Sequence, residues 1–181
     1  MRPGAALLAL LLAGPAAAAT EAAPEPEGYR QEHYRAPVPA TLQGAEVIDT
    51  EEAHRLWAAG VPFIDTLPHD FRPANLPEGT VWRDTPHDTI RGAVWLANTG
   101  YGALDPATEA WFLDMLGQLA RGRPDRSMVI FCKAECWMSW NAARRAVAHG
   151  FTGIRWYPEG VDGWAAANYP MERATPLRGA P

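Results

Sequence analysis

The chain has 181 residues, a length that predicts a single domain, and 48% of them are hydrophobic, enough for a packed core. Its 16 basic and 21 acidic side chains give a net charge of −5, which argues against nucleic acid as the partner. Eight tryptophans are many for this length. Some of them will lie in the core, and a cluster of exposed ones would indicate a partner surface.

The first 19 residues have the pattern of a cleavable secretion signal. Arg2 supplies a positive start, residues 7–12 form an apolar centre, and residues 17–19 are the small residues that precede cleavage before Thr20. The apolar part is too short to cross a membrane, so we expect no membrane span after cleavage. High Ala, Arg, Trp and Pro usage is typical of bacteria. The predicted location is therefore the periplasm, which is an oxidising compartment.

Residues 20–45 form an N-terminal arm rich in Pro, Ala and Glu, without hydrophobic periodicity. We interpret this arm as a tether or a loosely packed segment, which Tyr29, Tyr34 and Val38 could pin to the domain. The domain itself is predicted at residues 46–170, followed by a C-terminal tail at 171–181.

Within the domain, apolar runs typical of buried strands alternate with helical patterns. Strands are predicted at residues 61–65, 92–96, 128–131 and 154–157, and helices at about 50–59, 106–121, 139–149 and just after 160. The second helix is the clearest, because Asp105-Pro106 is a strong start signal and Phe112, Leu116 and Leu119 fall on one face. This alternation predicts an α/β fold with a parallel central sheet flanked by helices.

Residues 68–91 contain four prolines and little periodicity, and are predicted to form one long loop. Loops of this length are often functional or bind partners. The loop carries His69 and His87, which we expect to be solvated, and Trp82.

Both cysteines lie in a predicted seven-residue loop, 132–138, between a strand and a helix. Cys132 ends the strand, and the positive end of the following helix dipole favours a thiolate. Ligands of parallel sheets bind outside the carboxyl ends of the strands, where Asp65 is also predicted as a structural acceptor. Cys132 and Asp65 are therefore expected to face the same crevice.

Two cysteines four positions apart admit three chemistries. Cys132 could carry sulfur as a persulfide, with Lys133 helping to hold an anion. Cys132 and Cys136 could instead cycle between dithiol and disulfide. Two thiolates and Met138 are also soft ligands that suit Cu(I). A zinc site is disfavoured because the chain offers no second Cys/His pair near the two cysteines. The remaining interpretation is a purely structural pair, either a disulfide or two buried thiols, although a disulfide that closes so small a ring adds little stability.

Several segments, in order, make residues 47–164 resemble a rhodanese domain. They are Phe63-Ile64-Asp65, Ile90-Arg91-Gly92-Ala93-Val94, Val129-Ile130-Phe131-Cys132, the helix start with Ser139, Asn141, Ala142 and Ala143, and a closing pattern with Gly150-Phe151, Ile154, Glu159-Gly160, Gly163 and Trp164. The resemblance implies a rhodanese-like fold with the active cysteine at position 132.

The Cys136-Trp137 pair is similar, more specifically, to a rhodanese-related family of exported proteins. That family is named for a CXXCW motif and is associated with PQQ-dependent alcohol catabolism, although here three residues separate the cysteines. The resemblance implies a periplasmic role beside quinoprotein dehydrogenases and c-type cytochromes. The usual rhodanese loop holds six residues and often an arginine. The predicted loop, 132–138, holds seven residues and no arginine, and we therefore expect it to bind thiosulfate more weakly.

The leading hypothesis is therefore a sulfurtransferase or thiol-redox enzyme with Cys132 as nucleophile and Cys136 as resolving thiol. Residues of the loop and helix start are expected to bind the substrate or stabilise the charge on Cys132: Lys133, Ala134, Glu135, Trp137, Met138 and Ser139. The expected partner is a small sulfur donor or a thiol reductant, and no cofactor or metal is predicted. The alternative is a non-catalytic module that binds Cu(I), or docks on a quinoprotein or cytochrome c through the loop at 68–91.

Overall fold

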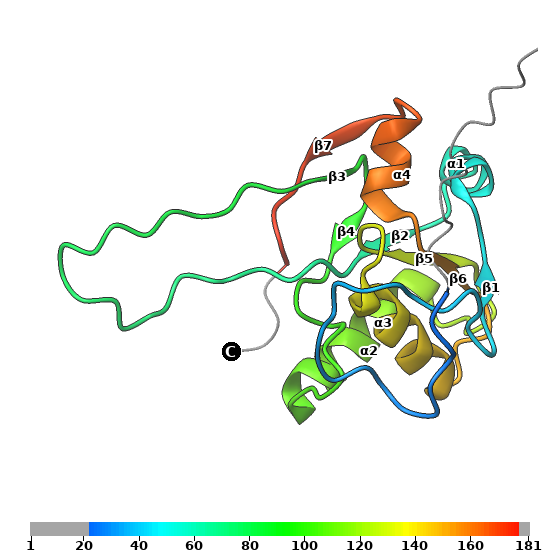
Figure 1. Ribbon diagram of the computed structural model, residues 1–181, viewed down its shortest axis with the longest axis horizontal. Coiled ribbons are helices and arrows are strands. Elements are labelled where there is room, and N and C mark those ends of the chain that lie inside the picture. Colours follow the sequence, from blue (N-terminus) through cyan, green and yellow to red (C-terminus); the bar gives the residue numbers. More distant parts are fainter. Residues whose placement is uncertain (1–21, 178–181) are drawn as a thin grey trace, which may run out of the picture.

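The computed structural model describes residues 22–177, so the predicted secretion signal lies outside the described residues. A central five-stranded sheet has the order β1 (Glu46–Val47), β6 (Ile154–Tyr157), β5 (Met128–Phe131), β2 (Phe63–Asp65) and β4 (Val94–Trp95). All four pairings in this sheet are parallel. The predicted α/β class with a parallel central sheet flanked by helices is confirmed (Figure 1).

Helices cover both faces of the sheet, as Figure 1 shows. One face packs against α2 (Pro106–Ala120) and α3 (Trp137–Ala148), and the other packs against α1 (Thr50–Ala58) and α4 (Gly160–Ala166). Strand β5 is buried along its whole length because alternate side chains point into each of these two cores. Cys132 follows directly on this central, fully buried strand.

The helix boundaries follow local capping. Asp49 caps α1 through the backbone N–H of Glu52, and Asp105 caps α2 through two backbone N–H groups. Helix α3 begins at Trp137, with Cys136 as its N-cap residue, two residues before the predicted start near Ser139. The loop between β5 and α3 therefore holds five residues, 132–136, and the predicted seven-residue loop is too long. Residues 132–136 are called the cysteine loop below.

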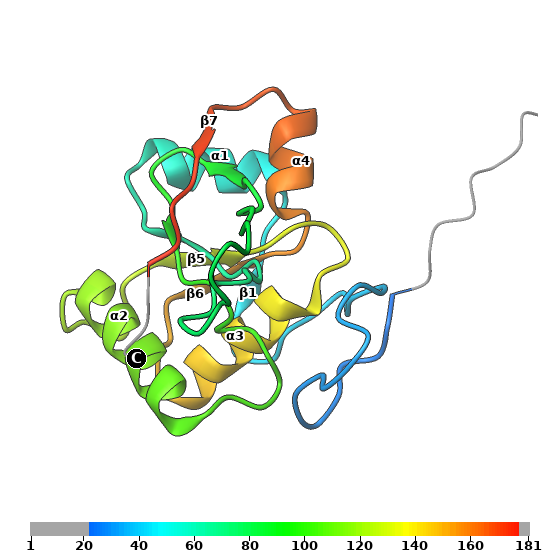
Figure 2. The ribbon, with the colours of Figure 1, turned by 90° about the vertical axis from the view of Figure 1, so that its left-hand side faces the viewer.

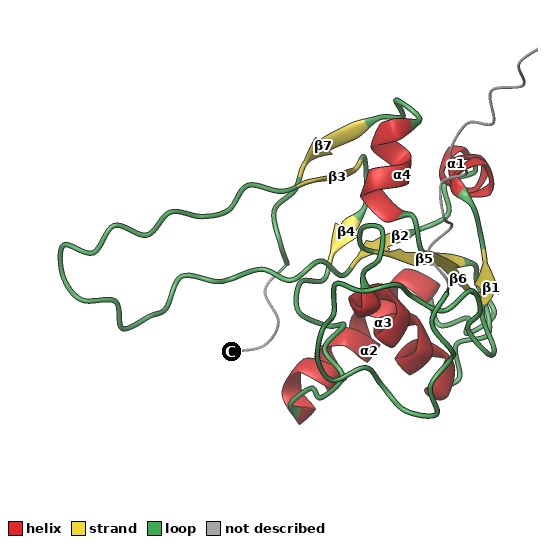
Figure 3. Ribbon diagram, in the orientation of Figure 1, coloured by secondary structure: helices red, strands yellow, loops and turns green. Residues whose placement is uncertain are grey.

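A second, two-stranded sheet joins β3 (Asp88–Ile90) to β7 (Met171–Arg173) in antiparallel register. Strand β3 lies inside the predicted long loop, and β7 extends the ordered fold three residues into the predicted tail. Between β2 and β3, residues 66–87 form an irregular loop that extends away from the body of the molecule (Figure 3). No helix among residues 22–177 is long and apolar enough to cross a membrane.

The N-terminal arm folds against the domain, and Tyr34 and Val38, two of the three side chains expected to pin it there, pack against the core. Residues 22–45, called the N-terminal strap below, run along α3 and past the cysteine loop (Figure 2). The indole N–H groups of Trp137 and Trp140 donate to the strap carbonyls of Pro37 and Thr41. The Asn141 side chain accepts from the Arg30 amide and donates to the Arg30 carbonyl, so α3 holds the strap at several points.

Candidate functional site

Both cysteines are free thiols and both are buried. Cys132 follows β5 and is 0% exposed, whereas Cys136 is the N-cap residue of α3 and is 3% exposed. The two sulfurs and Met138 form one small buried cluster, against which Tyr34 and Leu67 pack. The chain therefore brings its only two thiols together at the carboxyl end of the central strand, as the sequence predicts.

The two thiols are joined by a hydrogen bond, in which Cys132 donates to the sulfur of Cys136. This bond is the main reason that the pKa of Cys136 falls from 9.0 to about 7, with help from the backbone N–H groups of Met138 and Lys133. Burial, and then the neighbouring Cys136, raise the pKa of Cys132 well above 9.0. These directions favour Cys136 as the carrier of the negative charge in the reduced pair, whereas the sequence predicts the thiolate on Cys132.

The loop amides do not surround Cys132 as expected. The N–H of Lys133 points at the sulfurs, and that of Met138 points at Cys136. The N–H of Trp137 donates to the carbonyl of Tyr34 at 2.9 Å, and that of Ala134 donates to Asp162 at 3.1 Å. Because the helix starts at Trp137, its first free amides serve Cys136 and the strap rather than Cys132.

Asp65 lies at the carboxyl end of β2, directly opposite Phe131 in the neighbouring strand. Its buried carboxylate accepts hydrogen bonds from the Leu67 amide and the Thr89 hydroxyl, at 2.8 and 2.6 Å, and its Oδ2 lies 2.6 Å from Nε2 of His87. The prediction that Asp65 is a structural acceptor is confirmed. Its negative charge also contributes to the raised pKa of Cys132.

The two loop histidines are not solvated as expected. The His69 side chain is 6% exposed and that of His87 is 10% exposed, and each pairs through Nε2 with a carboxylate, of Asp84 and Asp65 respectively. Both rings contact the indole of Trp95. Together with Leu67, Pro68, Asp70, Thr85, Pro86 and Lys133 they line a hollow of about 220 Å³. This hollow reaches the cysteine loop at Lys133 and the sulfur cluster at Leu67.

The N-terminal strap pairs with the cysteine loop like a short antiparallel strand. The amide of Ala36 donates to the carbonyl of Glu135 at 3.1 Å, which places Arg35 opposite Cys136. The guanidinium of Arg35 donates to the carbonyl of Ala134 at 2.7 Å. The sequence analysis did not predict a role for Arg35. The sequence contains only an indirect indication of it: the buried indole N–H groups of α3 need carbonyl acceptors from another segment, and the strap that supplies them also carries Arg35.

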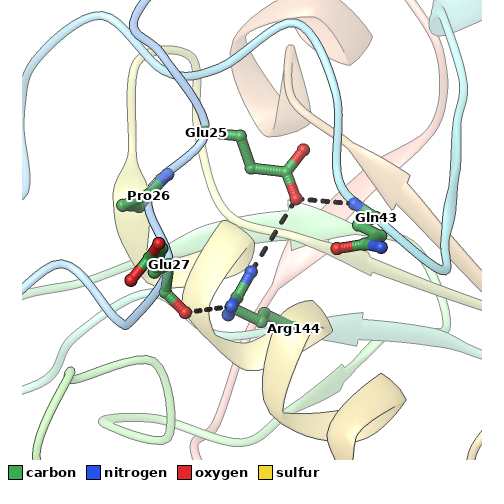
Figure 4. A pocket seen from close by; sticks show the side chains of 5 residues that line it. All are labelled: Glu25, Pro26, Glu27, Gln43 and Arg144. Atoms are coloured by element: carbon green, nitrogen blue, oxygen red, sulfur yellow. Dashed lines mark hydrogen bonds and ion pairs between the residues drawn. The ribbon is translucent and has the colours of Figure 1, made fainter.

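A second part of the strap is anchored farther along α3. Figure 4 shows Arg144 between Glu25 and Glu27, close to Gln43. Arg144 forms an ion pair with Glu25 at 3.7 Å and donates to the carbonyl of Glu27. The carboxylate of Glu25 also accepts from the Gln43 amide at 2.8 Å. This anchor holds the strap without touching the cysteine loop.

The remaining predicted site residues divide into two groups. Lys133 lines the hollow, and Met138 lies in the sulfur cluster, so both are placed where a substrate could meet them. Trp137 packs under the strap, with Arg30 over its ring. Ser139 is buried and bonds the carbonyl of Cys136 and the indole of Trp156, which makes it a structural residue. Among residues 22–177, no group of three or more His, Cys, Asp or Glu side chains could hold a metal ion.

No family model matches the chain, and no curated protein matches it. Among solved structures, the chain is similar to the polysulfide-sulfur transferase homodimer from Wolinella succinogenes, with 17% identity, a TM-score of 0.41, and coverage of 71% of this chain and 79% of that one. It is also similar to an uncharacterized protein from Saccharomyces cerevisiae, with 14% identity, a TM-score of 0.41, and coverage of 68% and 92%. At these values neither likeness supports a conclusion about family or activity.

Proposed function

We propose that this protein performs thiol chemistry in which the Cys132–Cys136 pair passes between dithiol and disulfide while reducing a small sulfur compound. The observation that carries the proposal is that the two free, almost fully buried thiols lie in one cluster at the carboxyl end of β5. The pKa of Cys136, lowered to about 7 mainly by Cys132, supports it. At neutral pH such a pair holds one thiolate and one thiol, which are the two species that thiol–disulfide exchange needs.

The lowered pKa of Cys136 favours an order of attack opposite to the predicted one. The Cys136 thiolate attacks one sulfur of a substrate disulfide or polysulfide, a new sulfur–sulfur bond forms, and the other sulfur leaves as a thiolate. Cys132 then loses its proton to solvent and attacks the sulfur of Cys136. This step forms the Cys132–Cys136 disulfide and releases the second substrate sulfur, so two electrons pass from the protein to the substrate.

The hollow beside the loop is the proposed place for the substrate. Its volume of about 220 Å³ suits a small molecule, and Lys133 on its wall can pair with an anionic end. Leu67 separates this space from the sulfurs, because it contacts both. A small sulfur donor therefore fits the site in size, and a protein substrate would have to displace the strap or this wall.

Mass spectrometry of the reduced protein after addition of polysulfide or glutathione disulfide tests the proposal. Wild type should lose the mass of two hydrogen atoms as the internal disulfide forms. Cys132→Ser should accumulate an adduct on Cys136, and Cys136→Ser should react much more slowly. If neither thiol gains an adduct and no disulfide forms with any of these compounds, the proposal is wrong.

Cu(I) binding is a second candidate, because the sulfur-containing side chains of Cys132, Cys136 and Met138 form one buried cluster. Thiolate and thioether ligands suit Cu(I). Competition of the reduced protein with a coloured Cu(I) chelator measures the affinity. A Cu(I) carrier should bind one ion and lose affinity in Met138→Leu, whereas the dithiol enzyme should keep its disulfide chemistry in that variant.

The proposal keeps the expected setting outside the cytoplasm, beside PQQ-dependent alcohol oxidation, with a quinoprotein or cytochrome c as the partner. Support comes from the pattern of residues 1–19 and from the resemblance of the Cys136-Trp137 pair. The extended loop at 66–87 offers a contact surface, since Val81 is 77% exposed. A fusion of residues 1–19 to a phosphatase that is active only after export tests the location: a fusion that stays inactive in the cytoplasm contradicts it.

A further inference from the structure

The cysteine loop carries no arginine, yet one is held against it from another part of the chain. Arg35 belongs to the N-terminal strap, 97 positions before Cys132 in the numbering of the chain. We propose that Arg35 is a positioning residue of the thiol site, which holds the cysteine loop in place and supplies the positive charge beside the reactive sulfur. This inference rests on the proposed function, because it concerns the same two thiols.

Backbone pairing fixes where Arg35 lies. The amide of Trp137 donates to the carbonyl of Tyr34, and the amide of Ala36 donates to the carbonyl of Glu135. Arg35 and Cys136 are therefore directly opposite each other in a pair that exchanges no hydrogen bonds of its own. In antiparallel strands such pairs have the closest Cα atoms, and their side chains lie on the same side. The position of Arg35 beside Cys136 follows from the main chain and not from a mobile side chain.

The guanidinium also fixes the tip of the loop. It donates to the carbonyl of Ala134 at 2.7 Å, one residue before Glu135, whose φ of 51° is a left-handed conformation that is costly outside glycine. The carbonyl of Glu135 is taken by Ala36. Two consecutive loop carbonyls are thus satisfied by the strap, which stabilises the turn that points the Lys133 amide at the sulfurs.

Charge supports the same role. Arg35 is among the groups that lower the pKa of Cys136, after the bond from Cys132 and the amides of Met138 and Lys133. On the other side, Asp65 contributes to the raised pKa of Cys132. A cation beside one sulfur and an anion beside the other favour the same asymmetry. Other charged side chains surround the pair as well: Lys133 and Glu135 lie on the loop, and Asp162 accepts from the Ala134 amide. The strap adds Glu25, Glu27, Arg30, Glu32 and His33, and α3 adds Arg144 and Arg145.

The variants Arg35→Gln and Arg35→Lys separate charge from shape, and Arg144→Gln is the matched control. Arg144 anchors the same strap through Glu25 and Glu27 but lies away from the loop (Figure 4). The thiolate of the reduced proteins is followed by its absorbance near 240 nm as the pH is raised. Arg35→Gln should hold about threefold less thiolate at neutral pH, whereas Arg35→Lys and Arg144→Gln should stay close to wild type.

Two outcomes would overturn the role of Arg35. One is an Arg35→Gln titration identical to wild type, and the other is an equal shift in Arg144→Gln, which would mean that any loosening of the strap has the effect. The titration uses no substrate, so it tests the effect of Arg35 on the thiolate even if the protein reduces no disulfide. Conversely, suppose that the wild type reduces polysulfide but the thiolate titration of Arg35→Gln equals that of the wild type. The proposed function would then stand, and only the role of Arg35 would be lost.

Discussion

Nε2 of His87 lies 2.6 Å from the buried carboxylate of Asp65, at the end of the strand that neighbours β5. The same carboxylate oxygen accepts from the hydroxyl of Thr89. His87 and Thr89 stand on the two sides of the junction between the extended loop and β3. Asp65 therefore ties the base of the loop to the sheet while it places a negative charge near Cys132.

Asp65→Asn should have two separable effects. Loss of the charge should bring the pKa of Cys132 down toward its ordinary value, and loss of matched acceptors for His87 and Thr89 should cost about 2–3 kcal/mol of unfolding free energy. Denaturant unfolding of the reduced protein measures the second effect. Asp84→Asn is the control, because Asp84 pairs with His69 but is 65% exposed and should cost under about 1 kcal/mol. Equal losses in the two variants would contradict a special role for Asp65.

The cysteine pair should make the stability of the reduced protein depend on pH. The pKa of Cys136 is about 7 in the folded state against an ordinary value of 9.0, so between pH 7 and 9 the unfolded chain binds more protons and stability rises with pH. The gain should reach about 2 kcal/mol. Above pH 9 the sign reverses, because the unfolded chain also loses the proton of Cys132, which the folded protein keeps.

Denaturant unfolding under reducing conditions at pH 6 to 10 measures this dependence. Wild type should show a maximum near pH 9, and Cys136→Ser should lack the rise between pH 7 and 9. A wild-type profile that falls steadily across this range would contradict the assignment of the thiolate to Cys136.

Much of the fold could be predicted because its central strands are continuous apolar runs. The predicted strands at 128–131 and 154–157 have the observed bounds. Both are buried between helices, so their apolar runs mark them in the sequence even when the strands they pair with are unknown. Strands β3 and β7 could not be found in this way. Each has three residues, and they form only because they pair with each other across about 80 positions.

The site was predictable in its residues but not in its electrostatics. The sequence placed Cys132, Cys136 and Asp65 at one edge of the sheet, but which sulfur carries the charge depends on where α3 begins, and that boundary differed by two residues. The composition of the strap lacks periodicity and so predicts no more than a tether or a loosely packed segment pinned by a few apolar side chains. Its attachment uses backbone carbonyls and amides, which any residue supplies, so no side-chain pattern reveals it.

Tyr34 should control access to the sulfurs. Its side chain packs against the sulfur cluster, and its hydroxyl accepts from the Gly102 amide at 3.1 Å. Tyr34→Ala should raise the rate of alkylation of the reduced protein by iodoacetamide, a small neutral reagent, about tenfold or more, because the thiols are almost fully buried in the wild type. Mass spectrometry should find the first label on Cys136.

Tyr34→Phe is the matched control for this prediction, since it removes the hydroxyl but keeps the ring over the cluster. It should react at close to the wild-type rate. If Tyr34→Ala is no faster than wild type, reagents reach the thiols by the Leu67 wall of the hollow, and Leu67→Ala should then be the fast variant.

Gly160 is the residue of α4 that fixes the cysteine loop from the opposite end of the chain. It has a φ of +53°, and a Cβ there would lie 2.4 Å from the carbonyl oxygen of Cys132 and 2.7 Å from its carbon. The same carbonyl accepts the Val161 amide at 3.0 Å, so the backbone cannot retreat without losing that bond. Gly160→Ala should therefore cost about 2–3 kcal/mol of unfolding free energy, through strain and a shifted Cys132.

Gly117→Ala is the control for Gly160→Ala, because it is expected to raise the free energy of unfolding rather than lower it. Gly117 lies inside α2, nothing stands within 4 Å of an added Cβ, and alanine should stabilise the helix by about 0.5–1 kcal/mol. Because Gly160 touches Cys132, its alanine variant should also change the thiolate titration, whereas that of Gly117→Ala should match wild type. A Gly160→Ala protein with wild-type stability and titration would show that α4 does not hold the cysteine loop, and the close approach of the two backbones would then have no part in positioning the thiols.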